Sequence, residues 1–198
     1  WVGRDAALAA GLPPVADPTL DDAIRIDVNA NRGVITGAND RAVLLAAYRT
    51  LRELGCAWVR PGDDGEILPL RSLDDARVQV CEAPARRHRA VTIEGAVSYA
   101  HVLNMIRWLP RVGMNGYFIQ FILPYQFLSR WYDHAENPLL APEPVTEAEV
   151  AAMARDLQRE IKARGLLYHA VGHGWTCEPL GMQGNSWNEL DVPVSDWQ

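Results

Sequence analysis

The sequence predicts an α/β protein: a small α+β N-terminal domain over residues 1–84, followed over residues 85–198 by the first three β/α units of an incomplete (β/α)8 TIM barrel. Three observations predict this fold. The first part contains a hairpin-like pattern and one helical pattern. After about Arg86, strand and helix patterns alternate strictly. The later strands are almost continuously apolar, which is typical of parallel strands buried on both faces.

The N-terminal part begins with a predicted hairpin. "AIRIDV" and "VITG" are strand-like segments around the turn sequence "NANRG". A helix follows, because Asn39 or Asp40 can cap its start and Gly55 suits its end. We expect one apolar face of this helix to be buried: Val43, Leu44, Ala47, Leu51 and Leu54. "CAWV" then predicts a short buried strand before the turn "RPGDDGE", and "ARVQVCE" predicts a further strand.

The second part contains three predicted strands, "AVTIE", "GYFIQF" and "LLYHAV". Ser98 can cap a helix between the first two strands, and Gly113 can end it. Its expected inward residues are Val102, Met105, Ile106 and Leu109. Thr146 and Glu149 form a capping box for the second helix, which Gly165 can end. Val150, Met153, Leu157 and Ile161 lie on one face of that helix.

A long proline-containing loop is expected between Ile122 and Val145. Its rings either form a lid or pack within the loop: Tyr125, Trp131, Tyr132 and His134. The helical crossovers imply a parallel sheet, so we expect further barrel strands beyond Gln198. A doubly wound sheet is the alternative, although no Gly-rich phosphate loop follows the first strand.

The composition excludes several classes of partner. The net charge is −6, which argues against nucleic acid because such binding needs clustered Lys and Arg. The one basic cluster is Arg86, Arg87 and Arg89. No apolar run approaches the roughly 20 residues that span a bilayer, so no membrane partner is expected. The chain begins with Trp1 rather than Met, so the compartment stays open, as does the oligomeric state.

The cysteines and histidines predict neither a metal centre nor a cofactor. The three cysteines are far apart and odd in number, which favours free buried thiols: Cys56, Cys81 and Cys177. His169 and His173 would lie about 13 Å apart along an extended strand, at roughly 3.3 Å per residue. That distance is too long for one zinc ion with bonds of about 2 Å.

Polar and aromatic side chains stand at the ends of the three later strands. Glu94 ends the first strand, Gln120 the second, and His169, His173 and Trp175 the third. Ligands bind at the carboxyl ends of parallel strands, because strand ends and loops converge there. An aromatic ring suits the apolar face of a sugar, and polar groups suit its hydroxyls. These residues are therefore candidates for sugar contact.

Each candidate also has a structural interpretation. Glu94 could pair with a charge on a neighbouring strand, and Gln120 could satisfy hydrogen bonds inside a barrel. His169 could be a satisfied core histidine. His173 is flanked by glycines, which favours a sharp loop there. Trp175 could pack against the edge of the core.

Two segments resemble a known family. "GANDRAVLLAAYRTLRELGCAWVRPGDDGEILP" resembles the accessory domain of an uncharacterised bacterial glycoside-hydrolase-like family, and more distantly that of family 67 α-glucuronidases and family 20 β-hexosaminidases. "RHRAVTIEGAVSYAHVLNMIRWLPRVGMNGYFIQF", continuing to "YHAVGHGWTCEPLG", resembles the first three strands of the catalytic barrel of the same bacterial family. The resemblance covers nearly the whole chain.

The similarity to family 20 implies roles for some residues. Arg89 and Glu94 match the spacing of a sugar-binding arginine and an acidic residue on strand one. Gly172 and His173 match a Pro-Gly-His turn whose histidine supports the catalytic acid, but Val171 replaces the proline. The same resemblance implies an acidic catalytic pair after strand four, which this chain does not reach.

The sequence therefore predicts the N-terminal portion of a glycoside hydrolase that acts on a carbohydrate, with its catalytic acid beyond this chain. The alternative is a non-catalytic carbohydrate-binding protein on a barrel scaffold. A barrel isomerase or lyase acting on sugars is a third hypothesis, which requires metal-ligating carboxylates on later strands. The expected substrate-binding residues are Arg89, Glu94, Gln120, His169, His173 and Trp175.

Overall fold

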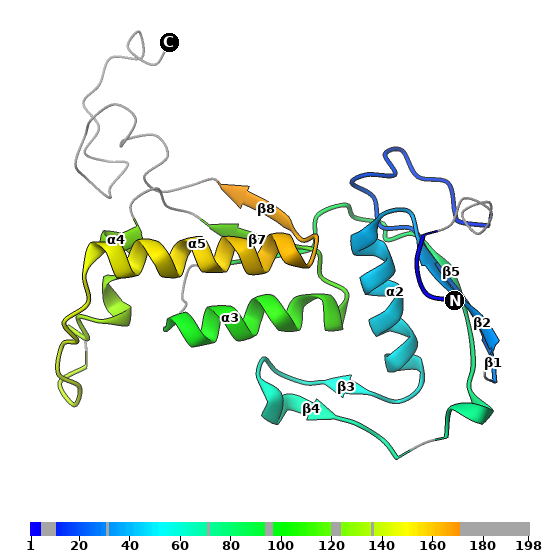
Figure 1. Ribbon diagram of the computed structural model, residues 1–198, viewed down its shortest axis with the longest axis horizontal. Helices are drawn as coiled ribbons and strands as arrows, with labels where there is room; N and C mark the ends of the chain where they lie inside the picture. The colour runs from blue at the N-terminus through cyan, green and yellow to red at the C-terminus, as the bar shows by residue number, and fades with distance from the viewer. Residues whose placement is uncertain are drawn as a thin grey trace, which may run out of the picture.

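The structure is a computed structural model that describes residues 1–4, 11–30, 32–70, 72–93, 97–119, 124–135 and 137–170. Its elements form two groups that lie side by side (Figure 1). Antiparallel strands and helix α2 make the first group, and parallel strands with helices α3 and α5 make the second. The predicted mixture of helices and sheets in an α/β chain is confirmed.

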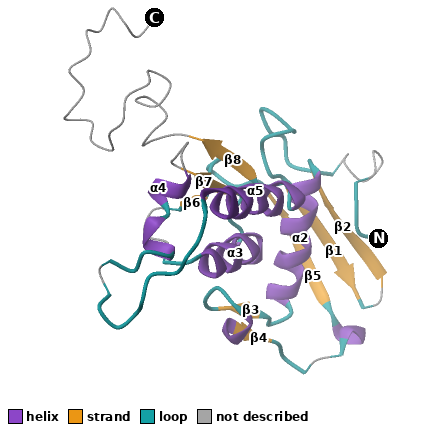
Figure 2. Cartoon of the chain, turned by 60° about the vertical axis from the view of Figure 1, so that its left-hand side comes forward, coloured by secondary structure: helices purple, strands orange, loops and turns teal. Residues whose placement is uncertain are grey.

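The first group is built on an antiparallel sheet with strand order β2-β1-β5. The predicted hairpin is confirmed: β1 (Ile24–Asn29) pairs with β2 (Arg32–Gly37). β5 (Arg77–Glu82) pairs with the other edge of β1. Helix α2 (Asp40–Glu53) packs on this sheet, and Figure 2 shows the sheet and α2 as adjacent layers.

The cap of α2 is confirmed, but of the expected buried face only Leu54 is buried. The Asn39 side chain accepts a 2.8 Å hydrogen bond from the Ala42 N–H, as an N-cap does. Ala42 and Ala46 pack against the sheet, and their small side chains let the helix approach it closely. Val43, Leu44 and Ala47 are half-buried and Leu51 is exposed. The buried residues of α2 are Arg41, Ala42, Leu45, Ala46 and Thr50.

A small hairpin follows α2. β3 (Ala57–Trp58) pairs antiparallel with β4 (Glu66–Ile67) around the short 3-10 helix η1 (Asp63–Gly65). Trp58 is buried, but Val59 is exposed, so the buried strand predicted here is only two residues long. A second 3-10 turn, η2 (Leu73–Asp75), leads into β5.

The second group contains a parallel sheet with strand order β6-β7-β8. The strands are β6 (Ala90–Thr92), β7 (Gly116–Ile119) and β8 (Leu167–Ala170). Both pairings are parallel, so the three segments run side by side in one direction, as predicted. Their carboxyl ends therefore share one edge of the sheet, which we call the carboxyl edge.

Two helices connect these strands. α3 (Tyr99–Trp108) continues into the 3-10 helix η3 (Leu109–Val112), and α5 (Glu147–Ala163) precedes β8. Both helices bury side chains in the same apolar cluster as Tyr117 and Ile119, so both cover one face of the sheet. The buried helix residues include the expected Val102, Ile106, Leu109, Val150, Leu157 and Ile161, while Met105 and Met153 are half-buried.

The segment between β7 and α5 is more regular than predicted. It contains α4 (Pro124–Phe127) and the 3-10 helix η4 (Ser129–Trp131). The Tyr125 and Tyr132 rings stack with centroids 5.0 Å apart, and Trp131 is buried in the main cluster. His134 forms a 3.0 Å contact with Glu143 through its Nε2. Of the two interpretations of these rings, the geometry favours packing within the loop.

The ends of α3 and α5 match their predicted signals. Ser98 accepts a hydrogen bond from the His101 N–H, and Thr146 and Glu149 form the full capping box. Gly113 and Gly165 have φ angles of 86° and 63°, in the left-handed region that glycine adopts easily.

Removing the capping box should weaken the second group. We expect Thr146→Ala to lower the free energy of unfolding by about 1 kcal/mol, because the Glu149 N–H loses the hydroxyl oxygen to which it donates. Urea denaturation followed by circular dichroism measures this change. Glu149→Gln is the matched control, because its amide oxygen can still accept the bond and the change should be smaller. Equal losses in both variants would contradict the capping box.

Candidate functional site

The carboxyl edge of β6, β7 and β8 is the expected ligand site. Glu94 and Gln120 follow β6 and β7 in the chain, and His173 and Trp175 follow β8. These four residues lie outside the described part of the structure, so their roles stay predictions. The described part of the site is the row of side chains that lies just before this edge.

Three register partners form that row. Thr92 of β6 pairs with Phe118 of β7, which in turn pairs with His169 of β8. Tyr117 and Ile119 point toward the helices, and side chains alternate along a strand. The row therefore points away from α3 and α5. Thr92 is exposed, and Phe118 and His169 are half-buried.

His169 is held between two rings. Its imidazole stacks on Phe118 with centroids 4.3 Å apart and planes 12° apart. His88, which precedes β6, meets the same imidazole edge-on at 5.0 Å. Gly116 helps to make room, because a Cβ there would lie 3.5 Å from His169 Cδ2 and 3.1 Å from the Ala90 methyl. The Phe118 and His88 rings therefore fix the orientation of the His169 imidazole.

The chemistry of His169 differs from that of a satisfied core histidine. Its Nε2 is buried and has no hydrogen-bond partner among the described residues. Burial, and next the nearby His88, lower the pKa of His169 below its ordinary 6.5. The imidazole is therefore neutral at pH 7 and can donate or accept one hydrogen bond at Nε2. An unpaired buried polar atom is costly, so a polar partner at this position would be stabilising.

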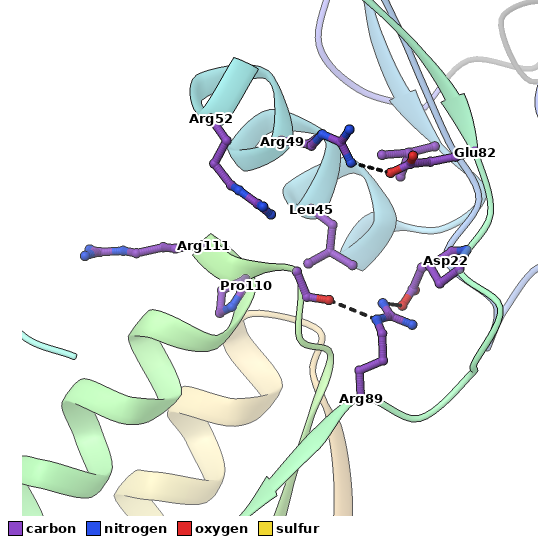
Figure 3. Close-up of a pocket in the computed structure, with 11 residues that line it drawn as sticks. Asp22, Leu45, Arg49, Arg52, Glu82, Arg89, Pro110 and Arg111 are labelled. Atoms are coloured by element: carbon purple, nitrogen blue, oxygen red, sulfur yellow. Dashed lines mark hydrogen bonds and ion pairs between the residues drawn. The ribbon is translucent and has the colours of Figure 1, made fainter. Parts of the chain in front are cut away.

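Arg89 lies elsewhere. It precedes β6, at the amino end of the sheet, opposite the carboxyl edge. Its Nε donates to the Gly113 carbonyl at 2.9 Å, and its Nη2 donates to Asp22 Oδ2 at 2.8 Å (Figure 3). Its Nη1 donates to the carbonyls of Arg86 and Arg87. The structure places the Arg89 guanidinium where it joins the two groups of elements, and does not bring it together with the row at the carboxyl edge.

Arg89 belongs to a buried network that sequence reasoning missed. The Asp22 carboxylate accepts 2.8 Å hydrogen bonds from Arg41 Nε and Arg89 Nη2, and a 2.7 Å bond from Asn115 Nδ2. The side chains of Asp22 and Arg41 are 0% and 6% exposed, so their charges are removed from water. We call these four residues the Asp22 hub. One sequence signal points to this network: Arg41 is a charged residue beside the apolar residues of α2, and a buried charge needs a partner.

The hub reaches the amino ends of all three parallel strands. Arg89 precedes β6, Asn115 precedes β7, and Arg41 Nη1 donates to the Gly165 carbonyl before β8 at 3.1 Å. Asn115 also bonds twice with the Arg89 backbone, once through its side-chain oxygen and once through its N–H. The Leu167 N–H donates to the Asn115 carbonyl.

Metal and thiol chemistry gain no support from the described residues. No group of three or more His, Cys, Asp and Glu side chains in this part of the chain is arranged to hold a metal ion. Cys56 is half-buried, but Cys81 is exposed, so the prediction of buried thiols is wrong for Cys81. Cys177 lies outside the described residues. No helix in the described ranges has the length and apolar character to cross a bilayer.

A comparison with protein-family models and with curated proteins found no match to this chain.

The Asp22 hub predicts a large stability effect. We expect Asp22→Ala to lower the free energy of unfolding by about 3–5 kcal/mol, because it leaves the buried Arg41 charge without its carboxylate. Urea denaturation measures the loss. Asp27→Ala is the control, because its 3.7 Å pair with Arg25 is about half exposed and should contribute less than about 1 kcal/mol. A loss no larger than that of the control would contradict the hub.

A second pair at this junction predicts a pKa change. The Arg87 guanidinium donates to Asp21 and holds the pKa of that carboxyl at about 2, below its ordinary 3.8. A lowered folded-state pKa means that this stabilisation is present above pH 3.8 and is lost as the pH falls toward 2. We expect Arg87→Gln to raise the Asp21 pKa toward 3.8, as measured by carboxyl NMR titration.

The control for this titration is Arg77→Gln, since among the described residues the Arg77 side chain donates only to a neighbouring carbonyl, that of Ala76. An Asp21 pKa that moves equally in both variants would contradict the assignment.

Proposed function

We propose that this chain is the N-terminal portion of a glycoside hydrolase, in which a (β/α)8 barrel begins at β6 and the catalytic acid lies beyond the chain. One observation carries the proposal. β6, β7 and β8 are parallel, lie in chain order, and have both described crossover helices on one face. A barrel requires this arrangement, because its helices form an outer ring and its strands curve around the other face.

The row beneath the carboxyl edge supports a carbohydrate ligand. In a barrel, Thr92, Phe118 and His169 would face the interior, just below the rim. The unpaired Nε2 of His169 is suited to a hydroxyl, which can both donate and accept. Neutral imidazole also avoids the cost of burying a charge under the sugar.

The residues that follow the strands would complete the binding site. Glu94 and Gln120 would bond to hydroxyls, with about 1.5–3 kcal/mol for a bond to the charged carboxylate. His173 would support the polar contacts, and Trp175 would offer a flat apolar surface to the ring. Hydrolysis itself needs two carboxyl groups around the scissile bond, and we place them on later strands.

Glycan binding by the 198-residue chain tests the site. We expect His169→Phe to weaken binding of any glycan identified in an array screen by about tenfold, a loss of about 1.4 kcal/mol, because the ring nitrogens disappear while the stack on Phe118 is kept. Isothermal titration calorimetry measures the affinity.

His101→Phe is the matched control, because His101 is exposed on α3, on the other side of the sheet. Binding that is equal in the two variants, or no binding of any glycan, would overturn the proposed site.

A separate assay distinguishes hydrolysis from binding alone. The 198-residue chain should not hydrolyse aryl glycosides, whereas a polypeptide extended past Gln198 along its own gene should. Hydrolysis by the shorter chain would contradict our placement of the acid. Glycan binding without hydrolysis by the extended polypeptide would favour the non-catalytic carbohydrate-binding protein.

A further inference from the structure

A cavity lies far from the carboxyl edge, at the junction of the two groups of elements. It has a volume of about 70 Å³ and lies between α2, the end of β5 and the turn after η3 (Figure 3). About 10–15 Å³ of such space holds one water molecule, so the cavity fits a few waters or one small ion but no sugar ring. Its charged lining residues are Asp22, Arg49, Arg52, Glu82, Arg89 and Arg111.

The lining is positive in a chain whose net charge is −6. Both carboxylates are already paired, since Glu82 accepts from Arg49 Nη1 at 2.6 Å and Asp22 accepts from Arg89 Nη2 at 2.8 Å. The excess charge therefore comes from the other two arginines. Arg111 is directed away from the cavity in Figure 3. It pairs with Glu66, and its guanidinium lies 5.9 Å from the Trp58 ring centroid.

Arg52 is the uncompensated cation. Among the described residues its side chain has no hydrogen bond and no ion pair. Figure 3 shows it extending from α2 toward the space between Leu45 and Pro110. A Cβ on Gly113 would lie 3.9 Å from Arg52 Nη1, so the guanidinium reaches the turn after η3.

The guanidinium groups of Arg49 and Arg89 have N–H donors that no described residue accepts. Arg49 uses its Nε on Glu53 and its Nη1 on Glu82, which leaves its Nη2 hydrogens without a described partner. Arg89 uses four of its five N–H groups in its described hydrogen bonds. Guanidinium groups match oxyanions in both charge and geometry.

We propose that this cavity binds one small oxyanion, such as phosphate, sulfate or a free carboxylate, with Arg52 as the main charge and Arg49 and Arg89 as additional donors. The bound ion connects the last turn of α2 to the turn after η3, and so joins the two groups of elements beside the Asp22 hub. The site is independent of the proposed carbohydrate site and stands even if that proposal fails.

Thermal unfolding of the 198-residue chain tests the proposal. We expect saturating sodium phosphate to raise the Tm by about 2–4 °C above sodium chloride of equal ionic strength, because a ligand that binds only the folded state stabilises it. Sodium sulfate and sodium acetate are the other two arms. A response to phosphate and sulfate alone assigns a tetrahedral ion, and a response to acetate assigns a carboxylate.

Two matched variants make the test specific. Arg52→Gln should abolish the phosphate response and still fold, because the Arg52 side chain has no partner among the described residues. Arg155→Gln should keep the response, since Arg155 is also an exposed helical arginine without a described partner but lies on α5.

Equilibrium dialysis with labelled phosphate gives the second measurement. We expect one saturable site whose affinity is at least about tenfold weaker in Arg52→Gln than in Arg155→Gln. Equal responses of the two variants, or equal effects of phosphate and chloride, would overturn the proposal. In that case, the only role left for Arg52 is the favourable interaction of its positive charge with the helix dipole at the carboxyl end of α2.

Discussion

The structure depends on one buried carboxylate. Removing Asp22 from water is costly unless its oxygens are hydrogen-bonded and its charge is paired, and Arg41, Arg89 and Asn115 meet both conditions. These partners come from α2 and from the amino ends of β6 and β7, so satisfying the carboxylate fixes the antiparallel group against the parallel one. Geometry at this junction is therefore specified by hydrogen bonds rather than by apolar area alone.

The Asp22 hub lies at one end of the parallel sheet, and the two ends of that sheet differ in chemistry. Its amino end is occupied by ion pairs and backbone bonds, whereas the described row at the other end contains stacked rings and the unpaired His169 Nε2. The buried ion pairs and the row that our proposal assigns to a ligand thus lie at opposite ends of the same strands, an arrangement that α/β barrels also have. Arg89 belongs to the first kind although its place beside β6 suggested the second.

Local sequence signals predict where the helices and strands lie. They do not predict polar contacts between residues that are far apart in the sequence. Asn39, Ser98 and Thr146 each cap a helix through bonds to residues three positions away, so sequence alone locates them. Periodicity predicts only part of the buried face of α2, because Arg41 is buried through its distant polar partners, and Ala42 and Ala46 pack against the sheet beside Leu54. Asp22 and Asn115 are 93 positions apart, and no periodicity links them.

The Arg41 bond to the Gly165 carbonyl spans 124 positions along the chain and has a consequence for the order of folding. A contact between such distant residues forms late, since a long loop must close first. During synthesis, α2 emerges well before β8, so Arg41 Nη1 stays hydrated until β8 arrives, whereas its Nε can already donate to Asp22. The antiparallel group therefore gains its full set of hydrogen bonds only when the second half of the chain docks.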